Sequence, residues 1–533
     1  MKEGVKVMDK IKKYGVILIC VILILISIVS RIPNIKEKYK CGDASEHTLL
    51  TMQCYEETPA SVHKFLPIVS LGQEEDKNIP WGECAKDDNG NYYYTSFSPA
   101  GFAIPYFFIK TLNLPINIYS LYAFNSLLYV LSFIITTCLF CKLFKKYLNK
   151  NIITIFTALI YLFQIEIMHC QGVIYWVHSI MQVLLPLQFL MFLNRNNSKG
   201  AKIGFYIMCV INPYIEWTGF VSNVIYAIIL FADKIAEEKK LTLKAFIKPL
   251  IIALLTILAL ALYIGHFSLA IDVNTFISIM KNRFVARDVL MANQRQEGIE
   301  KLIEGYFISF KYLIFLIAVM FIFVITTKKN REMLWKMIKE YKYELIYFSG
   351  IMLENILMMQ HATQYSFDRM KFIFLLLIFF YILSAVIYSS SKKKNMIETV
   401  FFIILIVASF ANLIEYKTGK YSYIEEERYK QNDIIISEYV NKEYNRENSI
   451  MASSGVIRGF MNLTFHRGIY ELQTYKQAQE LAVLNQKRYA IFCVIDKEDS
   501  RQLGILAVKI KDMEKNTEKI LTFENNSLVI LEK

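Results

Sequence analysis

The feature that most constrains this chain is a series of apolar blocks, separated by lysine-rich connectors. Each block has roughly 16–25 residues, and about 20 apolar residues in a helix cross a bilayer. Of the 533 residues, 55% are hydrophobic and 20% are charged, whereas soluble domains are about 45–50% apolar and about 25% charged. The pattern therefore predicts membrane-spanning helices. It excludes a soluble enzyme, a disordered chain, a secreted disulfide scaffold and a membrane β-barrel, whose strands would be short and alternating.

The first apolar block, residues 14–32, follows five lysines and runs into Arg31 and Pro33 without a small-residue cleavage site. A signal peptide would be shorter and would end at such a site, so we expect an uncleaved first span with a cytoplasmic N-terminus. About eleven spans are predicted in all, of which 203–217 and 218–233 are short. The later ten are at residues 117–141, 152–170, 176–194, 203–217, 218–233, 247–266, 309–327, 344–361, 370–390 and 397–415.

The distribution of lysine and arginine predicts the orientation of these spans. Lysines gather in the connectors at 142–150, 234–248 and 328–342, whereas the short connectors at 170–175 and 213–220 contain neither Lys nor Arg. Because cytoplasmic loops carry the excess of positive charge, the net charge of +13 reflects topology and not nucleic-acid binding. We therefore expect a multi-pass protein of the cell membrane.

The predicted organisation has two domains. Residues 1–416 form a transmembrane helical bundle with a large outer loop at 33–115, and residues 417–533 form a small extracytoplasmic α/β domain. In that domain we expect a helix near 475–486, strands at 489–495 and 505–510, and a hairpin turning at Asn525–Asn526. Three cysteines, Cys41, Cys54 and Cys84, fall in the outer loop; one pair can be oxidised there, and the sequence does not choose which.

The outer loop opens with the motif Cys41-Gly-Asp43-Ala-Ser-Glu46-His47. In a helix, Asp43, Glu46 and His47 share one face. Two carboxylates and an imidazole suit base catalysis or a divalent cation. The alternative is a capping box that starts a helix, and the two interpretations are compatible.

An aromatic run that includes Tyr93 follows in the same loop, and it leads into Ser98-Pro99-Ala-Gly101-Phe102 and the apolar stretch 103–109. This order is typical of a helix that lies in the membrane interface.

Two further groups of outer residues carry charge. Arg283 and Arg287 are four residues apart and share a helix face; they are either cations for an anionic group or solvated side chains. The connector between the ninth and tenth spans holds a second group: His361, Tyr365, Asp368 and Arg369. We expect it to bind phosphate or to shape an acceptor groove, with a solvated turn as the alternative.

Acids within spans are costly and therefore mark functional sites or structural pairs. Glu166, Glu216 and Glu354 are such acids. Glu166 and Glu216 are predicted near the outer face, on the same side as Asp43.

The order of these features resembles the GT-C membrane glycosyltransferases, in particular the protein O-mannosyltransferase and aminoarabinose transferase group. The resemblance implies a GT-C helical bundle that transfers a sugar from a polyprenyl-phosphate donor to an outer acceptor, with inversion at the anomeric carbon. It implies that Asp43 is the general base and that Glu46 is a second acid. Ser98 stands where the family has a lysine that meets the donor phosphate, so another cation must do this.

The predicted function is therefore a lipid-phosphate-dependent membrane glycosyltransferase. We expect Asp43 and Glu46 to be catalytic, and Arg283, Arg287 or Arg369 to hold phosphate. The remaining predicted substrate-binding residues are His47, Tyr93, Glu216, His361, Tyr365 and Asp368. No cofactor is certain, and a divalent cation is left open. The expected partners are the donor lipid, membrane lipid and a glycan, lipid or protein acceptor. The alternatives are a transporter or lipid-linked glycan flippase, and a non-catalytic cell-envelope assembly protein.

Overall fold

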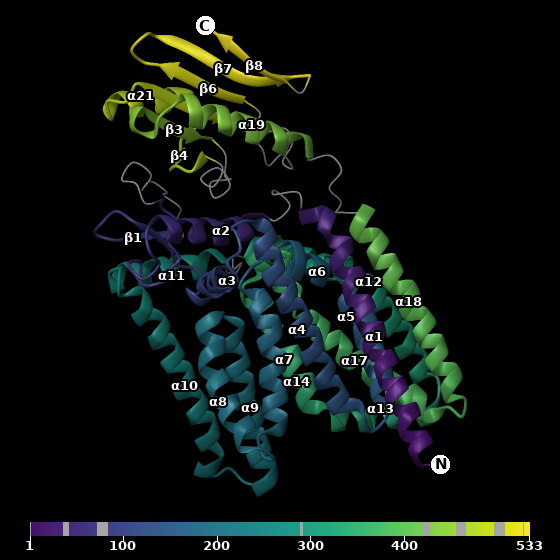
Figure 1. Cartoon of the computed structure of the whole chain (residues 1–533). Coiled ribbons are helices and arrows are strands. Elements are labelled where there is room, and N and C mark those ends of the chain that lie inside the picture. The colour runs from purple at the N-terminus through teal and green to yellow at the C-terminus, as the bar shows by residue number, and fades with distance from the viewer. Residues whose placement is uncertain are drawn as a thin grey trace. The chain divides into compact units, whose positions relative to one another are not determined.

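The computed structural model describes residues 2–35, 42–71, 84–287, 292–418, 427–454, 465–494, 507–525 and 527–533. It is mostly helical and has a small sheet near the C-terminus (Figure 1). This confirms the helical class and the C-terminal sheet region.

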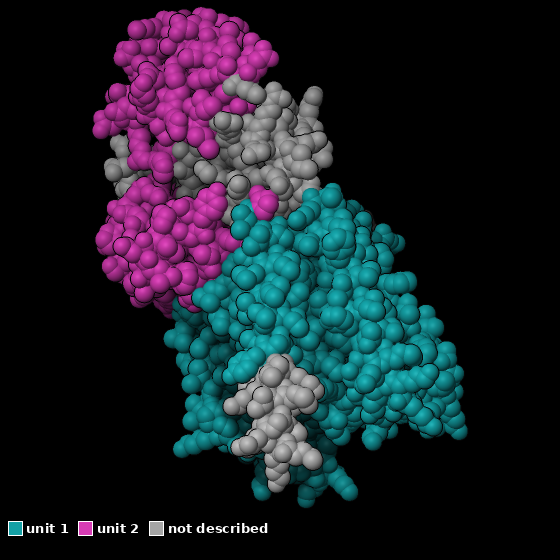
Figure 2. Space-filling model, turned by 45° about the vertical axis from the view of Figure 1, so that its right-hand side comes forward, with its two compact units in different colours: residues 1–32, 125–263, 284–421 teal, residues 33–124, 264–283, 422–533 magenta. Residues whose placement is uncertain are grey.

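Contacts divide the chain into two compact units, drawn in teal and magenta in Figure 2. Unit 1 comprises residues 1–32, 125–263 and 284–421, and unit 2 comprises residues 33–124, 264–283 and 422–533. Unit 1 holds most of the long apolar helices, and unit 2 holds the helices at residues 42–57 and 100–111 and the sheet.

Within the described residues, seven helices are long and apolar enough to cross a membrane, or eight if one bent pair counts as a span. The predicted number of about eleven is not confirmed. The helix α7 (His178–Asn194) and the helix α8 (Lys199–Ile215) have 17 residues each. The predicted span 344–361 is instead three short helices: α14 (Lys342–Gly350), α15 (Leu353–Leu357) and α16 (Met359–Gln364). The seven helices lie at Tyr14–Pro33, Ile118–Phe144, Thr218–Glu238, Leu243–Phe267, Gln296–Ile325, Ser366–Ser390 and Lys394–Thr418.

The centre of unit 1 is the helix α17 (Phe372–Ser390), most of whose residues are buried. It packs on α12 (Ala292–Ile325), α13 (Lys328–Glu340) and α14. A helix that is apolar all round belongs inside a bundle or in lipid, and the buried fraction assigns α17 to the inside.

One predicted span, 152–170, is broken. The helix α5 (Lys150–Leu162) turns by 69° into α6 (Ile165–Met168) and the π-helical turn η2 (His169–Val173). The guanidinium of Arg31, on α1 (Lys2–Ile35), is fully buried beside this break.

Arg31 holds the break in place through backbone carbonyls. It donates to the carbonyl of Gln171 at 3.1 Å and to that of Ser27 at 3.1 Å, and it lies 4.2 Å from the ring centre of Tyr129. A Cβ on Gly172 would lie 2.4 Å from the Arg31 Nη1 atom, so only glycine leaves room for this arrangement. Since a buried guanidinium satisfies several carbonyls at once, Arg31 stabilises the bent span.

In unit 2, the segment predicted as the first loop forms the helices α2 (Gly42–Glu57) and α3 (Ala100–Thr111). A short hairpin also forms, from β1 (Cys84–Lys86) and β2 (Tyr92–Tyr94). The helix predicted over 103–109 is thus confirmed as a helix. A capping box would place Asp43 directly before the helix, but Asp43 is the second residue of α2. Cys41 lies outside the described residues, so the cysteine pairing stays open.

The helices α2 and α3 are joined by Glu56. This carboxylate accepts hydrogen bonds from Lys110 Nζ at 2.8 Å and from the Tyr106 hydroxyl at 2.9 Å. Partial burial alone would raise the pKa of Glu56, but the bonds from Lys110 and Tyr106 outweigh it and lower the pKa below its ordinary value. Burial and the neighbouring carboxylate raise the pKa of Tyr106 to about 12.

The C-terminal part of unit 2 is a six-stranded sheet with the order β4-β3-β5-β6-β7-β8. The strand β3 is parallel to β4 and β5, and the remaining neighbours are antiparallel. The predicted helix, strands and hairpin are all confirmed, within a few residues at their ends. Their bounds are β3 (Ser449–Ser453), β4 (Tyr470–Glu471), α21 (Tyr475–Leu484), β5 (Tyr489–Val494), β6 (Ala507–Asp512), β7 (Thr517–Glu524) and β8 (Ser527–Glu532), with α19 (Glu427–Glu443) before them.

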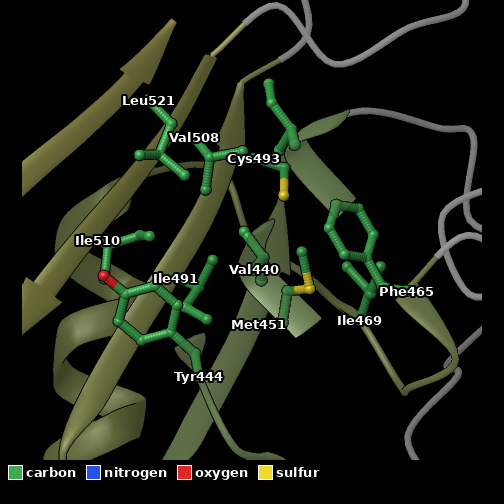
Figure 3. Close-up of a cluster of buried hydrophobic side chains, with 11 residues drawn as sticks. Val440, Tyr444, Met451, Phe465, Ile469, Ile491, Cys493, Val508, Ile510 and Leu521 are labelled. Carbon is green, nitrogen blue, oxygen red and sulfur yellow. The ribbon is translucent and has the colours of Figure 1, made fainter. Parts of the chain in front are cut away.

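The strand β5 is buried on both faces, as its unbroken apolar run predicts. Ile491 and Cys493 point to the core that includes Val440 of α19 (Figure 3). Ala490 and Phe492 pack instead against alanines of α21. The sheet is therefore covered by a helix on each face, and α21 starts at a capping box on Thr474 and Gln477.

Candidate functional site

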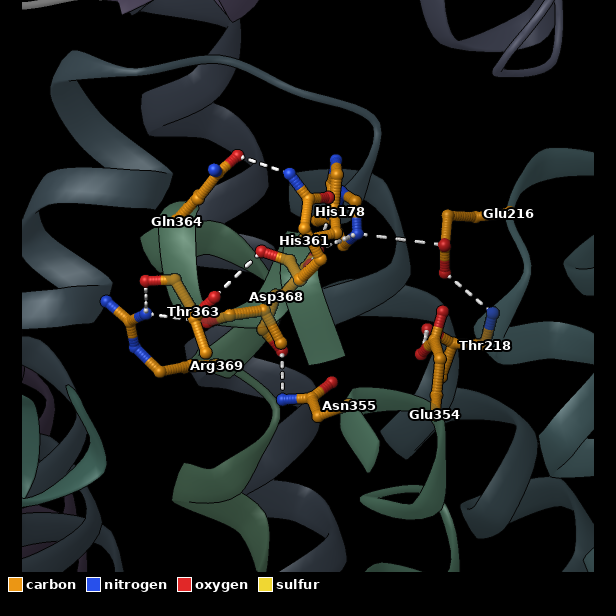
Figure 4. Close-up of polar contacts among 12 residues, drawn as sticks. His178, Glu216, Thr218, Glu354, Asn355, His361, Thr363, Gln364, Asp368 and Arg369 are labelled. Carbon is orange, nitrogen blue, oxygen red and sulfur yellow. Dashed lines mark hydrogen bonds and ion pairs between the residues drawn. The ribbon is translucent and has the colours of Figure 1, made fainter. Parts of the chain in front are cut away.

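A cluster of buried ionisable side chains lies in unit 1, where several helices begin or end (Figure 4). The helix α7 begins at His178, Glu216 directly follows α8, and Lys371 directly precedes α17. The turn from α8 into α9 (Thr218–Glu238) is tight, because a Cβ on Gly219 would lie 2.2 Å from the Asn212 carbonyl carbon. The local chain therefore brings polar residues together at helix ends that flank apolar segments.

Asp368 is the centre of this cluster. One carboxylate oxygen, Oδ1, lies 2.7 Å from His178 Nε2, and the other, Oδ2, lies 2.5 Å from His361 Nδ1. The two imidazole rings are 6.4 Å apart and nearly parallel. Asp368 sits on the 3₁₀ turn η3 (Ser366–Arg369), and Asn355 donates to its backbone carbonyl at 3.1 Å. A carboxylate shared in this way fixes the orientation of both rings.

The cluster continues from His178 to Lys371. Glu216 Oε1 is 3.6 Å from His178 Nε2, and Glu216 Oε2 accepts from the backbone N–H of Thr218 at 2.9 Å. The Thr218 hydroxyl donates to Glu354, and Glu354 Oε2 is 2.6 Å from Lys371 Nζ. Thr218 is the first residue of α9, so the helix N-terminus also stabilises the Glu216 carboxylate.

Arg369 forms a second buried ion pair beside Asp368. Its Nη2 is 3.2 Å from Glu166 Oε1, and its Nη1 donates to the carbonyl of Ala362 at 2.7 Å. Glu166 lies on α6, directly after the break in the bent span. A Cβ on Gly305 would come within 3.2 Å of the Arg369 guanidinium, so α12 also approaches this pair closely.

With all four carboxylates ionised, the charges of this cluster balance when both histidines are protonated. Four carboxylates (Glu166, Glu216, Glu354 and Asp368) face two permanent cations (Arg369 and Lys371) and two histidines (His178 and His361), and each of the eight is less than 9% exposed. With neutral histidines the net charge is −2, and with both histidines protonated it is zero. Since uncompensated buried charge is strongly unfavourable, proton uptake and the charge of any bound molecule are coupled here.

Several predicted site residues meet in this cluster. They are Glu216, His361, Tyr365, Asp368 and Arg369. The ring of Tyr365 packs 4.6 Å from that of His361. The alternative of a solvated turn is wrong for Asp368 and Arg369, because both are buried.

Three other predicted residues lie in unit 2. Glu46 is buried on α2, and the ring of His47 meets Tyr94 edge-on at 5.1 Å. The Tyr93 hydroxyl lies 3.0 Å from His63 Nδ1 and donates to Asp87 at 3.1 Å. Tyr93 thus has structural partners on both sides.

Of the remaining predicted residues, Arg283 is half-buried and lies with Arg287 on the helix α11 (Val273–Arg287). The side chains of Asp43 and Arg287 lie outside the described residues. Their roles remain predictions.

Sequence reasoning missed His178, Lys371 and Thr218 as site residues. The sequence did contain a signal for Lys371, which is a lysine at the start of an apolar block and two residues after Arg369. A lysine at such a place is costly to bury and therefore marks a functional or paired residue. Thr218 gave no signal, because a threonine in an apolar helix is common.

In the part of the chain that is described, no three His, Cys, Asp or Glu side chains converge as metal ligands would. The cluster instead supplies acid and base groups, cations and hydrogen-bond donors in a water-poor environment. Such a set can hold an ionic or sugar headgroup and move a proton to or from it. In comparisons with known proteins, no protein-family model and no curated protein matches this sequence.

Proposed function

We propose that this protein is a membrane glycosyltransferase that moves a sugar from a polyprenyl-phosphate donor to an acceptor on the outer face of the membrane. In the reaction, an acceptor oxygen forms a bond to the anomeric carbon while the bond from that carbon to the phosphate oxygen breaks. The polyprenyl phosphate leaves with the electron pair, and a base takes the acceptor proton. The reaction therefore needs a base and a positively charged site for the leaving phosphate.

The observation that carries the proposal is the buried cluster around Asp368. Folding alone does not favour eight buried ionisable groups in a bundle of apolar helices, and ionisable groups in such bundles usually mark a substrate path or a proton relay. Here Arg369 and Lys371 provide permanent positive charge, and His178 and His361 provide proton-transfer groups beside it.

In this proposal Asp43 is the general base, with Glu46 beside it on α2. Arg369 is the first choice for the cation that holds the donor phosphate, because it is buried directly after Asp368, the carboxylate that both histidines contact; Arg283 and Arg287 are the alternatives. Lys371 joins these candidates as a cation for the role that Ser98 cannot fill.

A transporter or flippase is the second candidate. The contacts that lead from Lys371 through Glu354, Thr218 and Glu216 to His178 favour it, since chains of ionisable groups serve as proton relays. Transporter sites lie between halves of broken helices, and Glu166 likewise directly follows the break in the bent span. The sequence, however, shows no internal repeat of the kind that transporters have, and this favours the transferase.

A transfer assay tests the proposal. The full chain in nanodiscs is given radiolabelled polyprenyl-phosphate sugars, one at a time, with a cell-envelope acceptor fraction, and the release of polyprenyl phosphate is measured with and without chelator. We expect turnover with at least one donor, and a loss of at least about 100-fold for Asp43→Asn, within the range for removal of a general base. Asp88→Asn is the matched control, because Asp88 is an exposed acid of the same outer segment.

The outcomes separate the three functions. Full activity of Asp43→Asn contradicts the base assignment. Failure of every donor contradicts glycosyl transfer, and proton uptake by proteoliposomes would then support transport. Absence of both activities would support a non-catalytic assembly protein.

A further inference from the structure

A second feature of unit 1 is an apolar groove between α9 and α10 (Leu243–Phe267), with a volume of about 490 Å³. Its lining residues include Ala227 and Phe231 of α9, and Phe246 and Ala253 of α10. Both helices are candidate membrane spans. The groove is therefore expected to open to hydrocarbon, and an unfilled space of this size would forfeit its dispersion contacts.

The two ends of the groove differ. At one end the rings of Phe231 and Phe246 meet with centres 4.9 Å apart. At the other end Asn223 donates to Thr256 Oγ1 at 2.8 Å and to the Cys209 carbonyl at 2.7 Å. Because this amide is bonded to protein groups, the groove presents an apolar wall to its occupant. The two ends are eight residues apart on α9, or about 12 Å of helix.

Positive charge collects beyond the aromatic end. The connection between α9 and α10, with the adjoining first turns of α10, carries four exposed lysines: Lys239, Lys240, Lys244 and Lys248. A fifth lysine, Lys234, is paired with Glu237 at 3.0 Å and Glu238 at 3.1 Å. The acids on this stretch therefore face mainly Lys234, and the four exposed lysines leave an excess of positive charge next to the groove.

We propose that this groove binds one chain of an anionic phospholipid whose phosphate headgroup lies at the four exposed lysines. The apolar wall matches the hydrocarbon chain, and the lysines match the phosphate, since basic residues at a membrane surface each attract anionic lipid by about 1 kcal/mol. This lipid is distinct from a glycosyl donor, whose phosphate has to reach the acid–base cluster at the opposite end of α9. The inference does not depend on the proposed glycosyl transfer.

Fluorescence quenching tests this site in the full chain. A Phe231→Trp reporter is placed in vesicles that contain brominated-chain phosphatidylglycerol or brominated-chain phosphatidylcholine, and quenching is measured relative to the wild-type chain. We expect phosphatidylglycerol to be preferred about fivefold, which corresponds to one net lysine–phosphate contact. A ratio near one would overturn the proposal.

Three variants separate the headgroup from the chain. Replacing Lys239, Lys240, Lys244 and Lys248 together by Gln is expected to reduce the ratio to about one. Replacing Lys392, Lys393 and Lys394 by Gln is the matched control, and the ratio is expected to stay unchanged. Ala253→Phe fills the groove, so quenching by both lipids is expected to fall. An unchanged ratio in the first variant, an equal fall in the second, or unchanged quenching in the third would each contradict the site.

Discussion

Loss of the Lys371 ammonium is expected to destabilise unit 1 strongly. Lys371 and Glu354 form a 2.6 Å ion pair, and their side chains are 5% and 6% exposed. Removing one partner of such a pair leaves a buried charge without compensation, which costs about 3–5 kcal/mol. Lys371→Met keeps the volume of the side chain and removes its charge, so we expect the free energy of unfolding to fall by that amount.

Loss of the Glu354 charge, the other partner of this pair, is expected to be less destabilising than loss of the Lys371 charge. Glu354→Gln removes one of four carboxylates and keeps an acceptor for the Thr218 hydroxyl, so it should cost less than Lys371→Met. The double variant, Lys371→Met with Glu354→Gln, removes both charges of the pair. The free energy of unfolding should then fall by only about 1–2 kcal/mol, the scale of imperfect hydrogen bonding. The measurement is denaturant unfolding of the full chain in detergent micelles, followed by far-ultraviolet circular dichroism.

The pair Lys110–Glu56 is a matched control, because it has the same chemistry and a similar distance of 2.8 Å, with side chains 45% and 35% exposed. Exposed pairs contribute about 0–1 kcal/mol, so Lys110→Met should have little effect. If Lys371→Met cost no more than Lys110→Met, or if the double variant were as unstable as Lys371→Met, the reasoning from burial would be refuted.

Three further predictions concern single positions. Gly172→Ala should destabilise the protein by about 1–3 kcal/mol, because its Cβ would meet Arg31. Gly265→Ala, with open space around it inside α10, should instead stabilise by up to about 1 kcal/mol. Unfolding titrations compare the two variants, and equal effects would contradict the contact. The pKa of Glu56 is lowered in the folded state, so its contribution to stability is present above its unfolded pKa and is lost as pH falls through the lower folded value. Glu56→Gln should therefore flatten the dependence of the free energy of unfolding on pH below about pH 4. A pH dependence identical to that of the wild type would count against this role of Glu56. Asn525 has a positive φ of 50° in the β7–β8 hairpin. Asn525→Val should therefore lower the free energy of unfolding by about 1–2 kcal/mol, and Asn525→Gly should lower it much less, in the same unfolding titration. A valine variant as stable as the wild type would argue against this turn conformation.

Local patterns predicted the C-terminal sheet well. The strand β5 is an uninterrupted apolar run, and the pair β7 and β8 is separated by two asparagines. Both signals act within ten residues and need no information about distant contacts. The helix α21 likewise begins at its own capping box, Thr474 and Gln477.

The spans were predicted less well, because apolar length alone does not distinguish a crossing helix from a broken one. Residues 344–361 are apolar enough for a span, yet the chain breaks there into α14, α15 and α16. The breaks bring Glu354 to Lys371 and His361 to Asp368. Ion pairs of this kind depend on where the helices break, and sequence periodicity does not record them.

Only the part of the site that is local in sequence could be found from the sequence. His361, Asp368 and Arg369 stood out because three charged groups gathered in nine residues of an otherwise apolar region. Their partners His178 and Glu166 lie about 190 and 200 residues away in sequence, and only the packing of α6 and α7 against η3 brings them together.

The carboxylate of Asp368 links His178 to His361, because both imidazole rings depend on it for their orientation. A protonated His178 or His361 raises the net charge of the cluster from −2 toward zero, so an anion that binds beside Arg369 should draw protons into the site. The same balance favours protonated rings in the empty site, so a departing phosphate would meet a histidine able to donate a proton. Proton uptake on anion binding would thus be a property of the cluster as a whole, and it would persist whichever cation contacts the phosphate.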